Sequence, residues 1–184
     1  MKTEFYDSET KLETERLLLR KLELSDAKDF YNKLYTPEVT EFYLMEGISS
    51  EDDEAIISII NGFFERKQYA FAITDKKTGE FMGIIHQCSG MNKYFRNVEV
   101  GYALASEYRN KGYMTEALSA FIKLLLSKGV HKVFATHLKE NTASGRVMQK
   151  CGMKFEGERE EEVFYKGKYH NILQYSIINT ASQA

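Results

Sequence analysis

Residues 98–118 read VEVGYALASEYRNKGYMTEAL, and this stretch decides the fold. Residues 98–104 have the apolar alternation of a β-strand, and a polar turn follows them. Beyond the turn, apolar residues recur every three or four positions, which is typical of an amphipathic helix. These residues are Ala117, Leu118, Phe121, Ile122 and Leu125. The stretch therefore predicts a strand, a glycine-containing turn and a helix in direct succession.

Such a turn is suited to holding an anion. The first N–H groups of a helix have no partner within the helix, and they lie at the positive end of its dipole. Gly112 lets the backbone approach an anion without a Cβ in the way, and Arg109 and Lys111 add positive charge. The spacing fits neither a Walker loop nor a dinucleotide-binding fingerprint. On these residues alone, a phosphate site and a plain basic linker both stay open.

The rest of the chain predicts the order β-α-α-β-β-β-α-β-α-β-β, a mixed α/β fold in one domain over residues 1–184, with a core of about 12–178. Pro37 is expected to end the first helix, and Ser50 with Asp53 forms a capping box before the second. Gly129 and Gly152 are expected to end the last two helices. The predicted elements are strands at 16–20, 69–74, 81–87, 98–104 and 133–138, helices after Ser25, Ser50, Thr115 and Asn141, and a strand pair around Lys166-Gly-Lys168.

Composition excludes several classes of protein. Twenty-five Lys and Arg against 27 Asp and Glu give a net charge of −2, which argues against a nucleic-acid binder. No apolar run approaches the roughly 18 residues of a membrane span, and the N-terminus lacks the apolar centre of a signal peptide. Two cysteines fit a reducing compartment, so we expect a cytoplasmic protein without a membrane partner. No Cys, His or Asp cluster has metal-ligand spacing, so no metal is expected.

Three separated motifs occur in a fixed order. Residues 12–20 read LETERLLLR, the stretch quoted above follows, and Asn141-x-x-Ser144 with Lys150-Cys-Gly152 comes after the next strand. Together they resemble the GNAT superfamily of acyl-CoA-dependent N-acetyltransferases, and within it the Rim-type branch. The resemblance covers about residues 12–178. It implies the GNAT fold, with a central, mostly antiparallel twisted sheet flanked by helices.

The resemblance implies a binding site for acetyl-CoA as co-substrate. Residues 109–114 match the family's pyrophosphate loop at Arg109 and Gly112, while Met114 replaces its last small residue. Met114 is therefore expected in helical geometry with its side chain turned away. The backbone of residues 102–104 is expected to pair with the pantetheine arm. The implied cofactor-binding residues are Tyr102, Ala103, Leu104, Arg109, Asn110, Lys111, Gly112, Tyr113, Met114, Thr115, Asn141 and Ser144.

The resemblance also implies direct attack of an amine on acetyl-CoA. Glu99 lies where many relatives place a general base, and Ser144 is the candidate acid, because Met148 stands where many relatives have a tyrosine. A backbone N–H near Ala103 is the candidate oxyanion donor. The alternative for Glu99 is a structural ion pair with Arg96 or Arg109.

The acceptor is expected to be a primary amine. An α-amine is neutral at pH 7 far more often than a lysine, so a site with one modest base suits a protein N-terminus. The alternatives are a small-molecule amine (a polyamine, an amino acid or an antibiotic) and a non-catalytic acyl-CoA-binding module.

The resemblance also implies a homodimer. A structural thiol is favoured for Cys151, a satisfied histidine for His86 and a solvated strand face for residues 156–162.

Overall fold

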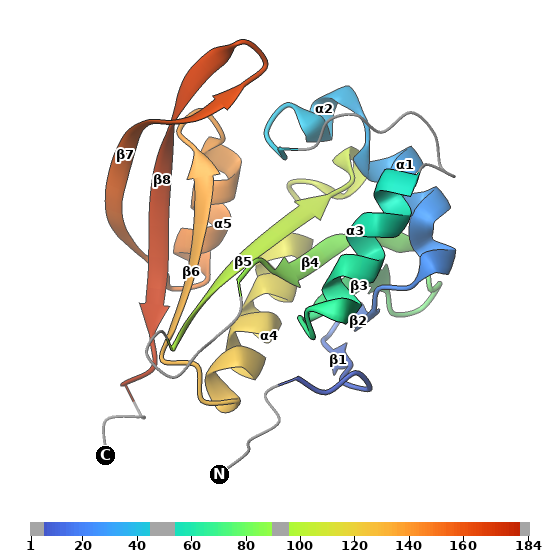
Figure 1. Cartoon of the computed structure of the whole chain (residues 1–184). Helices are drawn as coiled ribbons and strands as arrows, with labels where there is room; N and C mark the ends of the chain where they lie inside the picture. The colour runs from blue at the N-terminus through green and yellow to red at the C-terminus, as the bar shows by residue number, and fades with distance from the viewer. Residues whose placement is uncertain (1–5, 45–53, 90–95, 181–184) are drawn as a thin grey trace.

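The computed structural model describes residues 6–44, 54–89 and 96–180. Its centre is an eight-stranded sheet in the order β1-β2-β3-β4-β5-β6-β8-β7, in which β5 and β6 are parallel and all other neighbours antiparallel (Figure 1). The mixed α/β fold is confirmed. The strands are β1 (Leu12–Glu13), β2 (Leu17–Lys21), β3 (Ala70–Asp75), β4 (Phe81–Gln87), β5 (Asn97–Leu104), β6 (Lys132–Leu138), β7 (Lys154–Tyr165) and β8 (Lys168–Ile178).

Helices cover both faces of the sheet (Figure 1). Two of them, α1 and α3, pack with one face of β3–β5, and α4 packs against the opposite face. The fifth helix, α5, contacts α4, β6 and β8. The helices are α1 (Ala27–Leu34), α2 (Pro37–Thr40), α3 (Glu54–Glu65), α4 (Tyr113–Ser127) and α5 (Thr142–Lys150).

The sheet splits at its middle. The β5–β6 ladder is confined to Asn97–Glu99 against Lys132–Phe134. On its other edge, β6 pairs with β8 along its whole length. Residues 100–104 of β5 pair with β4 on their other side. The edge of β5 that faces β6 therefore leaves its backbone groups open beyond Glu99, and the two halves of the sheet diverge around this gap.

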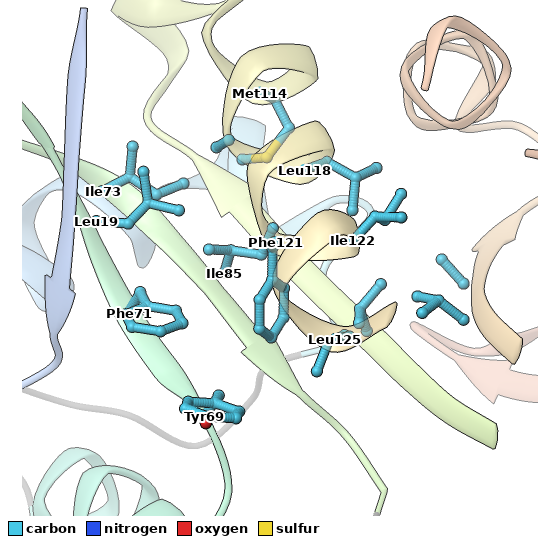
Figure 2. Close-up of a cluster of buried hydrophobic side chains, with 14 of the residues drawn as sticks. Leu19, Tyr69, Phe71, Ile73, Ile85, Met114, Leu118, Phe121, Ile122 and Leu125 are labelled. Atoms are coloured by element: carbon cyan, nitrogen blue, oxygen red, sulfur yellow. The ribbon is translucent and has the colours of Figure 1, made fainter. Parts of the chain in front are cut away.

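The main core lies between the sheet and α4. All five apolar residues predicted to share one face of this helix are buried, and Met114 joins them, as expected for a residue in helical geometry. Figure 2 shows Phe121 reaching from α4 toward β3 and β4. There its ring packs edge-on against the ring of Phe71, with 5.6 Å between the ring centroids. Each such side chain contributes roughly 1.5–3 kcal/mol on burial. The core thus fixes the start of α4 relative to β5.

Most predicted elements are present, with differences at the proline and at the ends. Helix α1 ends at Leu34, before Pro37 as expected, but Pro37 then begins the short helix α2. Proline suits this first helical position because its missing N–H is not needed there. Gly129 and Gly152 follow α4 and α5 with φ of +86° and +81°. The capping box at Ser50 and most of the polar loop after Ser89 lie outside the described residues.

Candidate active site

A cleft of about 520 Å³ opens where the sheet splits. Its walls are the open edge of β5, the turn before α4, helix α5, and the segment around α2. All the predicted cofactor-binding residues except Lys111 line it. The other lining residues are Val39, Phe42, Tyr43, Val100, Gly101, Tyr108, Thr136, His137, Ala143, Arg146, Val147 and Lys150.

The turn before α4 has the backbone geometry that an anion site needs. Asn110 and Gly112 have φ of +62° and +82°, and Gly112 is the N-cap of α4. A Cβ at Gly112 would meet only the Arg16 guanidinium, at 3.4 Å, so the outer side of this turn is open. The N–H groups of Tyr113, Met114 and Thr115 belong to the first turn of α4, where helix donors have no partner within the helix. The cleft at this end can therefore hold phosphate.

Arg16 and Glu116 fix the position of that turn. Arg16 donates to Glu116 Oε2 through Nε at 2.7 Å and to the carbonyl of Lys111 through Nη1 at 3.0 Å. Its guanidinium also lies 4.3 Å from the ring centroid of Tyr113. Partial burial raises the pKa of Glu116, but hydrogen bonds from Thr14 and Arg16 outweigh it and leave that pKa lowered. Glu116 is thus ionised and neutralised by Arg16. No local sequence pattern predicted this pair.

Arg109 is placed differently from the alternative suggested by the sequence. Its side chain donates to the carbonyls of Leu104 at 3.4 Å and Glu38 at 3.0 Å, and so ties the turn to α2. Arg96 donates to the carbonyl of Gly129. In the described part of the chain neither arginine is ion-paired with Glu99, so that alternative is wrong. Each guanidinium instead donates hydrogen bonds to nearby backbone carbonyls.

Glu99 is bound to a neutral partner on the neighbouring strand. Thr136 Oγ1 donates to Glu99 Oε1 at 3.0 Å, and the Glu99 N–H donates to Ser89 Oγ at 3.0 Å. Glu99 is half-buried and lies outside the cleft lining, whereas Thr136 lines the cleft. The threonine hydroxyl therefore connects the carboxylate with the cleft. Nothing in the sequence pattern indicated this connection.

Helix α5 presents its N-terminal end to the cleft. Asn141 is the N-cap, and its side chain accepts the Ser144 N–H at 3.2 Å. The Ser144 hydroxyl lies 2.9 Å from the phenol oxygen of Tyr102, which reaches it from β5. Burial raises the pKa of Tyr102, although its hydrogen bond with Ser144 opposes this, so the phenol keeps its proton. Met148 is fully buried and does not line the cleft.

A half-buried histidine, His86, lies on β4 beside β5, near the aromatic part of the cleft. The backbone carbonyl of Gln87 can only accept, so His86 Nδ1 carries the proton and Nε2 accepts from the Tyr43 hydroxyl at 2.6 Å. Burial, with a smaller contribution from Arg66, lowers the pKa of His86 to about 4. The ring of Phe63 packs against the imidazole of His86, with 4.9 Å between the ring centroids. His86 is thus neutral and satisfied, as expected, and it fixes Tyr43 in the cleft wall.

Three further features of the described residues concern metal binding, membrane crossing and the thiol of Cys151. No group of three or more His, Cys, Asp or Glu side chains is arranged to hold a metal ion within the described ranges. None of the helices described has the length and apolarity needed to cross a bilayer. Cys151 caps α5, where its Sγ donates to the carbonyl of Thr115 at 3.4 Å, in line with a structural thiol.

Comparison with known proteins agrees with this geometry. The acetyltransferase (GNAT) domain family matches residues 16–154. The uncharacterized N-acetyltransferase YoaA of Bacillus subtilis is 29% identical over 91% of this chain and 96% of its own. The acetyltransferase (GNAT family) from Bacillus anthracis has a similar crystal structure, with a TM-score of 0.81, 27% identity, and coverage of 92% of this chain and 99% of that one.

Two relatives have named acceptors. The ribosomal protein uS5-alanine N-acetyltransferase of Escherichia coli is 23% identical over 64% of this chain and 62% of its own. The spermidine N(1)-acetyltransferase of Vibrio cholerae is 24% identical over 90% of this chain and 94% of its own. These two proteins act on different kinds of amine, but both transfer an acetyl group. The chain therefore belongs to the GNAT family of acetyl-CoA-dependent N-acetyltransferases.

Proposed function

We propose that this enzyme acetylates the N-terminal amine of a protein or peptide, with acetyl-CoA bound in the cleft between β5 and α5. The observation that carries the proposal is that an open strand edge, a helix N-terminus and a pair of hydroxyl groups meet in one cleft. An extended amide-containing arm can pair with the first, a diphosphate can bind the second, and a thioester can reach the third. The thioester, the amide-containing arm and the diphosphate are three consecutive parts of acetyl-CoA.

The lining of the cleft supports an N-terminal amine as the acceptor. Val39, Phe42 and Tyr43 form an apolar and aromatic wall near α2. Among the described residues that line the cleft there is no Asp or Glu, so a polycation such as a polyamine finds no counter-ion there. An α-amine needs about 3.5 kcal/mol less deprotonation work than a lysine, a difference of about 2.5 pKa units. The E. coli relative acts on a ribosomal-protein alanine, which is an acceptor of this kind.

The proposed reaction is a direct transfer. The amine nitrogen attacks the thioester carbonyl, the C–S bond breaks, and the acetyl group moves to nitrogen while CoA leaves as its thiolate. Thr136 and Glu99 supply a route for the ammonium proton, with Glu99 as the final base. The Tyr102 and Ser144 hydroxyls supply hydrogen bonds for the thiolate, and the Ala103 N–H is the candidate donor to the oxyanion.

The test is a thiol-release assay with acetyl-CoA and three acceptors. A short peptide with a free N-terminal alanine is compared with the same peptide after N-terminal acetylation, which retains any lysine, and with spermidine. The proposal predicts CoA release with the free peptide alone. Release with spermidine but not with the free peptide contradicts the choice of acceptor, and release with neither favours a non-catalytic acyl-CoA-binding module.

A further inference from the structure

Two cations on α5 are left without a counter-ion at the cleft. Arg146 and Lys150 both line it, and both side chains are exposed. Neither has an ion-pair partner among the residues that the structure describes. Arg109, on the opposite wall, already donates to two carbonyls. Arg16 lies outside the cleft lining and is paired with Glu116. The charge on α5 is therefore available to a bound molecule.

The arrangement of the two cations favours the binding of an anion. They are four residues apart on one helix, so their side chains are neighbours and repel each other. Helix α5 reads TASGRVMQK and has no acidic residue to offset them. The repulsion is relieved when a group with more than one negative charge binds between them.

The position along α5 indicates which anion this is. The N-terminal end of the helix holds Asn141 and Ser144, which suit the neutral thioester end of acetyl-CoA. Lys150 lies six residues beyond Ser144, about 9 Å along the helix. The diphosphate is assigned to the separate site at the start of α4. Arg146 lies only two residues beyond Ser144, so the pair extends from near the thioester end toward the C-terminal end of α5. One phosphate group of CoA, the 3′-phosphate, is still unassigned on this wall.

We propose, on the basis of the function proposed above, that Arg146 and Lys150 bind the 3′-phosphate of CoA and make the enzyme selective for CoA over 3′-dephospho-CoA. A phosphomonoester carries a charge of about −1.5 to −2 at pH 7, with its second pKa about 6. It is thus the most concentrated negative charge of the cofactor. Arg146 can bind its oxygens through two donors, and Lys150 acts as a point charge.

The test is calorimetric titration of the full chain with CoA and with 3′-dephospho-CoA. Because both cations are exposed, each is expected to contribute about a 3- to 10-fold preference for CoA. Arg146→Gln and Lys150→Gln should each weaken CoA binding by that factor, and the double variant should bind both ligands equally. Affinity for 3′-dephospho-CoA should stay unchanged in all variants. Raising the salt concentration should reduce the selectivity of the unmodified enzyme.

Lys123→Gln is the matched control, because Lys123 is an exposed cation on α4 that does not line the cleft. It should leave both affinities unchanged. Equal binding of the two ligands by the unmodified enzyme would overturn the proposal, as would an equal loss of affinity for both ligands in the α5 variants. If neither ligand binds the unmodified enzyme, the proposed function fails as well, which separates the two failures.

Discussion

The phenol oxygen of Tyr102 lies 2.9 Å from the Ser144 hydroxyl, so β5 and α5 meet across the cleft through two hydroxyl groups. The resemblance to the GNAT family pointed to Ser144 as a weak acid, because Met148 replaces a tyrosine of many relatives. Met148 instead fills the core, and a phenol reaches the same hydroxyl from β5. With its pKa raised by burial, this phenol acts as a donor of a hydrogen bond rather than as a strong acid.

Tyr102→Phe should therefore slow the chemical step. Hydrogen bonds to ionised groups contribute about 1.5–3 kcal/mol, so kcat is expected to fall about 10- to 100-fold. KM for acetyl-CoA should change little, because the ring and the backbone of residue 102 remain. The thiol-release assay measures both constants. An unchanged kcat would show that the phenol does not contact the leaving thiolate.

The Arg16–Glu116 pair should control cofactor affinity from outside the cleft. In Arg16→Gln, Glu116 keeps its charge without its neutralising partner, one turn into the helix whose start is the proposed diphosphate site. Acetyl-CoA affinity is expected to fall about 5-fold or more, as for a loss of about 1 kcal/mol or more. The double variant Arg16→Gln with Glu116→Gln should recover part of this affinity in calorimetry. No recovery would mean that Arg16 acts only through its contacts with Tyr113 and the Lys111 carbonyl.

Gly145 allows α5 to lie directly over His137. A Cβ at this position would lie 2.8 Å from His137 Nε2. The ring cannot move away easily, because Nδ1 is bound to the Leu138 carbonyl at 2.8 Å and the ring stacks on Tyr175. Gly145→Ala should destabilise the fold by about 1–3 kcal/mol and lower activity by displacing Ser144. Gly157→Ala is the control, since a Cβ there meets nothing within 4 Å. Equal urea midpoints for both variants would contradict this packing.

His86 and His137, whose pKa values are lowered in the fold, should make the protein less stable as pH falls. Burial lowers the pKa of His86 to about 4 and also lowers that of His137, whereas the unfolded chain takes up these protons near pH 6.5. The unfolded state therefore binds more protons, and His86 alone should lower the free energy of unfolding by about 1.4 kcal/mol per pH unit below about 6.5.

Urea unfolding of the unmodified protein and of His86→Gln between pH 7.5 and 4.5 measures this dependence. The variant should show a shallower decline, because glutamine does not titrate. Equal slopes would show that His86 is not protected from protonation. Below this range carboxylates dominate, such as Glu156: partial burial raises its pKa, but hydrogen bonds from Lys132, Ser176 and Gln174 bring it down to about 2.

Local periodicity predicted the helices and strands, because an element with one face in the core repeats its apolar residues with the period of a helix or a strand, and a fully buried element is apolar throughout. All five residues predicted for the apolar face of α4 are buried, and β4 was predicted with the same bounds that the structure has. The short helix α2 was missed. The fixed φ of a proline disfavours the interior of a helix but suits its first position, so Pro37 both follows the end of α1 and begins α2. The cofactor-binding positions were named from the resemblance, and the structure gathers all but Lys111 in one cleft.

The partners of the functional groups could not be predicted. Glu99 meets Thr136, Arg16 meets Glu116, and each of these contacts joins residues far apart in the chain. Side-chain pairs between elements depend on the register of the sheet and on the angle of the helices, and neither is encoded in local periodicity. Tyr102 illustrates this, since the resemblance suggested a role for its backbone only, whereas the structure shows that its phenol also meets the Ser144 hydroxyl.

Calorimetric titration of the unmodified protein, Gly112→Asp and Gly129→Asp with acetyl-CoA tests the diphosphate site at the start of α4 most directly. Both glycines have positive φ, at +82° and +86°, and each lies near one arginine at an opposite end of α4. The backbone strain is therefore matched, and the added charge differs only in its position. Micromolar binding by the unmodified protein and by Gly129→Asp, with loss of binding in Gly112→Asp, is the predicted result. Equal binding by all three would contradict the assignment of the diphosphate site to the start of α4.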